Sequence, residues 1–161
     1  MCIRDRGGSA QGTLGDADLG TTIVDVHGQV QIRGFDFRGL YAKANIDDAV
    51  AFNKAHKLEG SKGLAETLEG GYIIIGYNVL SQTSDIDGPS FTPYVKFERV
   101  DTQASMPVGY NRSLSTLNNF RTIGFEFKPI PNVVIKVDHM WVTNKAKSGL
   151  NQFNVNLGYG F

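Results

Sequence analysis

Hydrophobic and polar residues alternate with a period of two over most of this chain. Residues 23–33 read Ile-Val-Asp-Val-His-Gly-Gln-Val-Gln-Ile-Arg, so one parity carries Val24, Val26, Val30 and Ile32 and the other carries Asp25, His27, Gln29 and Gln31. Successive side chains of a β-strand point to opposite faces. The segment is therefore predicted to be a strand with one apolar and one polar face.

The same reasoning predicts six more strands, with almost no helix. Arg33-Gly34 is predicted to form a tight hairpin turn, and Asp47-Asp48 to begin a short N-capped helical segment. The further strands are expected at residues 35–46, 70–80, 91–103, 120–128, 133–143 and 152–161.

Strand length and connection length favour a membrane barrel over a soluble β-sandwich or barrel, which would also alternate. The expected strands have about ten residues, longer than the usual strand of about five or six and close to what a tilted strand needs to cross a bilayer. Connections are expected to alternate between short and long, as in outer-membrane barrels. The fold class predicted is all-β, an antiparallel transmembrane β-barrel of which about seven strands are present, open or incomplete.

Aromatic residues on the apolar parity support this interpretation. Two aromatic belts are expected, as at membrane interfaces: one near the long-loop end with Tyr41 and Trp141, and one near the short-turn end with Phe35, Phe37, Tyr77, Phe127, Tyr159 and Phe161. The C-terminus resembles the insertion signal that the barrel assembly machinery reads as an added strand. The residues of that signal are Phe153, Val155, Leu157, Tyr159 and Phe161.

Composition excludes several other classes of protein. The 161 residues carry no net formal charge, 41% are hydrophobic, and there is one cysteine. No nucleic-acid partner, disulfide framework or multi-cysteine metal site is expected, and the chain is too hydrophobic for disorder.

The N-terminal 20 residues differ from the rest of the chain. Residues 1–6 lack the apolar stretch of a signal peptide and resemble a translated sequencing artefact, and residues 7–20 are predicted to be a loop. We therefore expect residues 1–20 to be a truncated leader and loop, and residues 21–161 to be the C-terminal strands of a larger barrel.

Four segments resemble the C-terminal part of a family of Gram-negative porins related to the phosphate-selective porins O and P. They are residues 39–42, 71–80, 92–98 and 128–136. The resemblance implies about 16 to 18 strands in the whole barrel, a passive channel for small hydrophilic solutes or ions, an outer-membrane location and often a homotrimer.

The polar parity predicts the side chains of the pore wall. Its expected charged residues are Asp25, Asp36, Arg38, Lys96, Glu98, Glu126, Lys128, Lys136 and Asp138. Cations and anions are about equal in number, so the sequence does not support a phosphate-selective channel, and cross-strand ion pairs are the simplest role for these charges.

Signals for catalysis are weak, and we predict no enzyme, no metal site and no cofactor. The histidines His27, His56 and His139 lack metal-ligand spacing, no nucleophile elbow occurs, and Asp85 to Gly88 resembles only part of a calcium loop. Two alternatives stay open: a barrel enzyme whose catalytic residues lie outside this chain, or an adhesin or structural barrel that uses residues 47–69 and 104–119.

Overall fold

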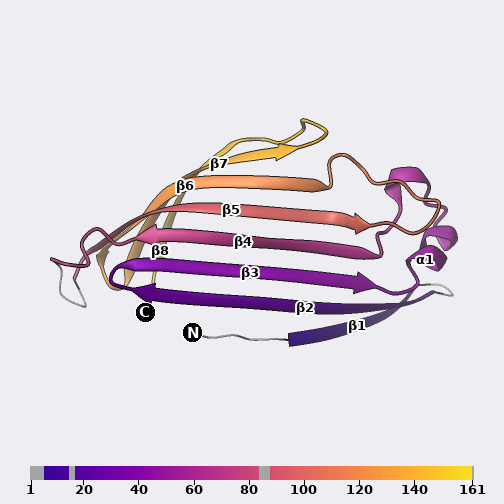
Figure 1. Cartoon of the computed structure of the whole chain (residues 1–161), viewed down its shortest axis with the longest axis horizontal. Coiled ribbons are helices and arrows are strands. Elements are labelled where there is room, and N and C mark those ends of the chain that lie inside the picture. Colours follow the sequence, from indigo (N-terminus) through magenta and orange to yellow (C-terminus); the bar gives the residue numbers. More distant parts are fainter. Residues whose placement is uncertain (1–5, 15–16, 84–87, 161) are drawn as a thin grey trace.

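The computed structural model describes residues 6–14, 17–83 and 88–160, with side chains from Leu19 onward. They form one antiparallel sheet of eight strands, in which every strand pairs with its neighbours in sequence (Figure 1). The strands are β1 (Arg6–Leu14), β2 (Ala17–Ile32), β3 (Phe35–Ile46), β4 (Thr67–Tyr77), β5 (Ser90–Ser105), β6 (Leu117–Ile130), β7 (Val133–Asn144) and β8 (Gln152–Tyr159). The all-β prediction is confirmed.

All seven predicted strands occur. Their ends differ from those expected by at most three residues except at the start of β2, which begins at Ala17 and not at residue 23; β3 agrees at both ends. The prediction of a loop at residues 7–20 is wrong, because β1 fills most of it and pairs with β2 from Arg6 opposite Asp25 to Leu14 opposite Ala17. This strand consists mainly of glycine and small residues, so it lacks the alternation of apolar and polar side chains from which the other strands were predicted. Residues 1–5 lie outside the described residues.

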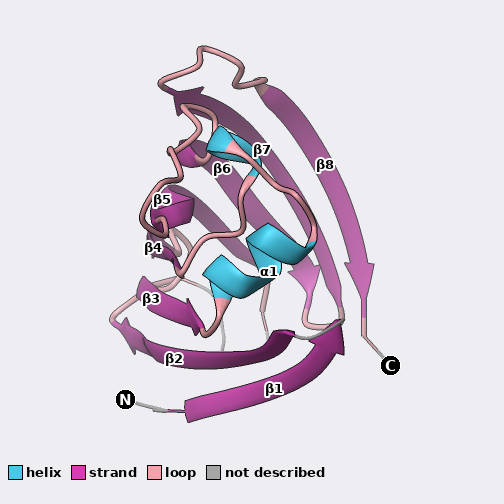
Figure 2. Ribbon diagram, turned by 90° about the vertical axis from the view of Figure 1, so that its right-hand side faces the viewer, coloured by secondary structure: helices cyan, strands magenta, loops and turns pink. Residues whose placement is uncertain are grey.

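The sheet curls but does not close. In Figure 2 it forms an arc from β1 round to β8, with α1 (Ala49–Ala55) in front of the hollow side. Strands β1 and β8 are the two edges, and no pairing joins them among the described residues. The structure is thus an open curved sheet, which leaves two edges for further strands.

The register of strand pairing determines which residues lie on the same face of the sheet. One row crosses seven strands and consists of Val30, Phe37, Ile75, Val95, Ile123, His139 and Phe153. The side of the sheet that carries this row is called the apolar face below, and the opposite side, which carries Lys96 and Glu126, is called the polar face. The strand pairing puts Val24, Val30, Ile123, Phe125, Ile135 and Leu157 on the apolar face and Lys96, Glu126, Lys136 and Asn156 on the polar face.

The apolar face is exposed and the polar face lies inside the curve. Ile123 is 53% exposed, whereas its neighbour Thr122 on the polar face is 9% exposed. Among the described residues the buried hydrophobic ones are only Ala49 and Ala65, both in the connection between β3 and β4. The sheet therefore has no apolar core of its own.

The connections do not alternate strictly between short and long as expected. Turns of two residues, Arg33-Gly34 and Pro131-Asn132, join β2 to β3 and β6 to β7, but the β4–β5 connection at the same end spans residues 78–89. At the other end, β1 and β2 are separated by residues 15–16 alone. We call the end with the two tight turns the turn end, and the opposite end the loop end.

Two long connections at the loop end are joined by buried polar contacts. Asn53 is fully buried, donates a hydrogen bond to the carbonyl oxygen of Leu64 (3.0 Å) and accepts one from its N–H (2.6 Å). Gln103 donates to the carbonyls of Ser61 (3.0 Å) and Gly63 (3.3 Å) and accepts from the N–H of Ser113 (2.7 Å). Residues 47–66 and 106–116 therefore form one cap, which we call the loop cap. The predicted side-chain N-cap of α1 is wrong, because Asp48 has a φ of 53° and makes no capping bond.

Candidate pore-lining surface

The predicted pore-lining residues all lie on the polar face. Arg38 is opposite Ile74, which is opposite Lys96; Glu126 is opposite Lys136. Asp25 and Asp138 occupy positions of the same parity on β2 and β7. The period-two pattern is therefore sufficient to place these side chains on one surface.

Charges on this surface pair along a strand, not across strands as predicted. Lys96 binds Glu98 at 2.5 Å, Lys128 binds Glu126 at 3.2 Å, and His27 Nδ1 lies 3.1 Å from the Asp25 carboxylate. Each pair consists of residues two positions apart, which stand side by side on the same face of a strand. The polar face thus neutralises much of its own charge locally.

Arg38 and Asp36 form the most extensively bonded pair. The Arg38 guanidinium donates from Nε and Nη2 to Asp36, with a shortest contact of 2.5 Å, and Gln29 and Gln31 add bonds of 3.2 and 3.3 Å from β2. Asp36 is thereby surrounded by donors, and Arg38 is the more exposed partner of the pair, with its side chain 44% exposed against 14% for Asp36.

A row of alternating large and small residues crosses the polar face from β3 to β8. In register it contains Asp36, Gly76, Tyr94, Gly124, Asp138 and Asn154. Tyr94 on β5 donates its hydroxyl to Asp138 on β7 (3.0 Å), passing over Gly124 on β6, and Asn154 on β8 donates to the other carboxylate oxygen (2.8 Å). A Cβ at position 124 would lie 2.9 Å from the Tyr94 hydroxyl.

This network changes the interpretation of Asp138. The residue lies on the predicted surface, but it is only 8% exposed because Tyr94 and Asn154 cover its carboxylate. Tyr94 has the parity of Lys96 and so belongs to this face, but its bond to Asp138 cannot be inferred from one strand because the partners lie on β5 and β7. The sequence signal for this contact is Gly124, which lies in register between Tyr94 and Asp138 and leaves room for the tyrosine to reach across β6.

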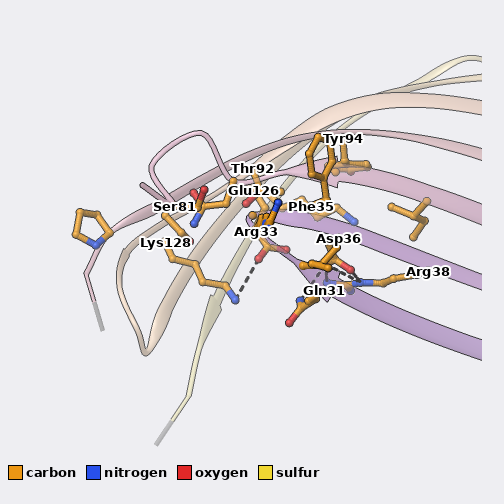
Figure 3. A pocket seen from close by; sticks show the side chains of 18 of the residues that line it. Gln31, Arg33, Phe35, Asp36, Arg38, Ser81, Thr92, Tyr94, Glu126 and Lys128 are labelled. Atoms are coloured by element: carbon orange, nitrogen blue, oxygen red, sulfur yellow. Dashed lines mark hydrogen bonds and ion pairs between the residues drawn. The ribbon is translucent and has the colours of Figure 1, made fainter. Parts of the chain in front are cut away.

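A hollow of about 620 Å³ lies on the polar face at the turn end (Figure 3). Its lining includes Asp36, Arg38, Tyr94, Glu126, Lys128 and Lys136. Lys136 places its ammonium 5.1 Å from the centre of the Tyr94 ring, and no ion pair with a carboxylate is formed by it among the described residues. The hollow is therefore polar, with charges of both signs.

The predicted insertion residues on β8 are the most exposed apolar set among the sheet residues whose side chains are described. Phe153, Val155, Leu157 and Tyr159 are 68%, 64%, 77% and 63% exposed on the apolar face. Phe161 lies outside the described residues. Their exposure follows from the position of β8 as an edge strand.

The histidines and acidic residues of the described part of the chain do not gather into a metal-binding group. No group of three or more His, Cys, Asp or Glu side chains there is placed to hold a metal ion. His139 lies on the apolar face without a bulge, edge-on to Trp141 at 4.4 Å between ring centres, and His56 stacks on Phe52 at 4.1 Å. The calcium-like segment falls partly in residues 84–87, which lie outside the described residues.

Among the described helices, none has the length and hydrophobicity of a membrane-spanning helix. A scan against protein-family models and searches of curated proteins and of solved structures each found no match.

Proposed function

We propose that this chain forms part of the wall of an outer-membrane porin, a passive water-filled channel for small hydrophilic solutes or ions. The observation that carries the proposal is the distribution of apolar residues: they lie on the exposed side of a curved sheet that has almost no buried apolar core. A water-soluble sheet would cover such a face, because a contiguous exposed apolar surface of this extent is rare in soluble monomers. Lipid is a suitable covering.

The backbone supports the same environment. In hydrocarbon every N–H and C=O group must be paired within the protein, which a sheet achieves when it closes. The two open edges, β1 and β8, would then pair with strands from outside residues 6–160, as the family resemblance implies for a barrel of about 16 to 18 strands.

The charges of the polar face suggest weak ion selectivity. Lys96 and Lys128 each pair with a carboxylate on their own strand, and Arg38 pairs with Asp36. A channel selective for phosphate needs a ladder of cations that are not neutralised in this way, whereas Lys136 alone of the four cations predicted for the pore wall forms no ion pair in the described part of the chain. We therefore propose general diffusion and not phosphate transport.

The proposal includes a location and partners. The protein would reside in the outer membrane of a Gram-negative bacterium, contact lipid through the apolar face, and be inserted by the barrel assembly machinery through β8. The homotrimer is an expectation from the family resemblance alone.

Conductance in a planar bilayer tests the function. The full-length gene product should give ion-conducting steps, and replacing Glu98 and Glu126 by Gln should shift the reversal potential toward anion preference, because Lys96 and Lys128 lose their partners. Glu69→Gln, the same substitution on the apolar face, is the matched control and should leave the reversal potential unchanged. Absence of conductance above background overturns the proposal, and an equal shift in the control removes the assignment of the polar face to the lumen.

A further inference from the structure

Two arginines interrupt the apolar face near the loop end. Arg99 on β5 and Arg121 on β6 are exposed and occupy diagonal positions, since Arg99 is opposite Asn119 and Arg121 is opposite Phe97. Diagonal neighbours in an antiparallel pair lie about 7–8 Å apart, within reach of two long side chains that converge on one group. The pair can therefore hold a single anion from two sides.

The nearby carboxylates on this part of the sheet are already bonded. Glu69 accepts a hydrogen bond from the Tyr41 hydroxyl (3.1 Å), and Asp101 is 2% exposed and pairs with Arg112 of the loop cap. Neither Arg99 nor Arg121 forms an ion pair in the described part of the chain. Both guanidinium groups thus remain available to an external anion.

The position of the pair matches the edge of an apolar band. From Phe91 to Arg99 the strand runs about 27 Å at about 3.4 Å per residue, and outward-facing residues between them are apolar. Arg121 is opposite Trp141, and Tyr41 is opposite Gly71, the partner of Arg99. Arginine on a lipid-facing surface is costly at the bilayer midplane and nearly neutral close to the interface, where Trp and Tyr also collect.

A bare strip of backbone lies beside these residues. Gly28 is opposite Gly39 on the apolar face, and a Cβ at Gly28 would have no atom within 4 Å. A hollow of about 980 Å³ lies at this strip, and its lining includes both glycines, Ile73, Phe97, Arg99 and Arg121. The hollow therefore combines an apolar floor with a cationic end.

We propose that this surface binds an anionic lipid, with the lipid phosphate between Arg99 and Arg121 and an acyl chain against Ile73, Phe97 and the glycine strip. This lipid site rests on the proposed function, since the apolar face must contact lipid. Charge complementarity identifies the occupant: the apolar hollow alone would accept any hydrocarbon, whereas two unpaired guanidinium groups select a phosphate.

Quenching of Trp141 tests the site, because Trp141 is the direct partner of Arg121. The full-length protein, with any tryptophan outside residues 1–161 replaced by Phe so that Trp141 alone fluoresces, is placed in phosphatidylcholine vesicles that contain brominated phosphatidylglycerol or, separately, brominated phosphatidylcholine. We expect phosphatidylglycerol to associate about tenfold more strongly. Arg99→Gln with Arg121→Gln should bring the ratio close to one, while Arg33→Gln, at the opposite end of the sheet, should leave it unchanged.

The outcomes separate this site from the channel. Equal quenching by the two lipids in vesicles that still conduct ions overturns the lipid site alone. Retained preference for phosphatidylglycerol without conductance overturns the channel and supports the lipid site. Loss of the preference on adding millimolar inorganic phosphate at constant ionic strength overturns the lipid as occupant, because a free anion then satisfies the arginines.

Discussion

At the scale of single residues, glycine positions decide which side chains can meet across this sheet. Tyr94 and Asp138 are on strands that do not pair with each other, and the gap at Gly124 lets the tyrosine hydroxyl cross β6. A buried carboxylate with two donors is stable only while both reach it, since an unsatisfied buried polar group costs about 1–3 kcal/mol.

We predict that Gly124→Ala destabilises the protein by about 1–3 kcal/mol. The new Cβ would lie 2.5 Å from the carbonyl oxygen of Val137 and 2.9 Å from the Tyr94 hydroxyl, so the strand must shift and the bond to Asp138 must break. Urea unfolding in detergent micelles measures the change. Gly28→Ala is the control, because its Cβ meets nothing within 4 Å, and it should leave stability unchanged or slightly raised. Similar losses for both variants would contradict the role of Gly124.

At the scale of elements, the β2–β3 hairpin depends on the backbone conformation of two residues. Arg33 has a φ of 47° and Gly34 a φ of 85°, so both central residues are left-handed, as in a type I′ turn. Glycine adopts this conformation without cost, whereas arginine does so reluctantly.

Arg33→Asn is therefore predicted to stabilise the hairpin by up to about 1 kcal/mol, because Asn tolerates positive φ and favours this turn. Gly34→Ala should destabilise it by about 1–2 kcal/mol, and its Cβ would also lie 2.3 Å from the Ser81 hydroxyl. Paired urea midpoints measure both effects. A gain in stability from Gly34→Ala is incompatible with the left-handed turn.

The loop cap is the second element whose order depends on one residue. Asn53 bonds both the N–H and the carbonyl of Leu64, so Asn53→Ala should release residues 47–66 from their folded arrangement. We predict faster cleavage by trypsin after the exposed Lys54 and Lys57, with the sheet left intact. Phe52→Leu, which leaves the asparagine bonds in place, is the control and should be cleaved more slowly than Asn53→Ala.

Local pattern was enough to predict most elements but not the contacts between them. Alternation located β3 to its end residues because Phe35 and Phe37 alternate with the charged Asp36 and Arg38. It missed β1, whose Gly, Ser and Ala residues give no apolar face to detect. It also could not reveal that Lys96 pairs with Glu98 on its own strand, because the partner choice depends on the geometry of side chains and not on their parity.

At the scale of the whole molecule, the sheet exposes its apolar side chains more than its polar ones, which is the opposite of the arrangement in a water-soluble protein. Phe97 is 54% exposed, whereas the Lys96 side chain beside it is 28% exposed. Either the apolar face contacts lipid or it is covered by another protein surface. Adjacent residues on one strand can separate these environments, because their side chains leave the sheet on opposite sides.

Single-cysteine variants at positions 96 and 97 make this comparison, in a background where Cys2 is replaced by Ser. In lipid vesicles we expect Lys96→Cys to react with a membrane-impermeant maleimide and Phe97→Cys to be protected, since the thiol at position 97 would lie in hydrocarbon. If water surrounds both faces of the sheet, the thiol at position 97 should react faster than the thiol at position 96, because position 97 is the more exposed of the two. Protection of both thiols in vesicles would contradict a water-filled lumen, and reaction of both would contradict a lipid-facing surface. The lumen and the lipid contact are thus tested by two neighbouring residues on one strand.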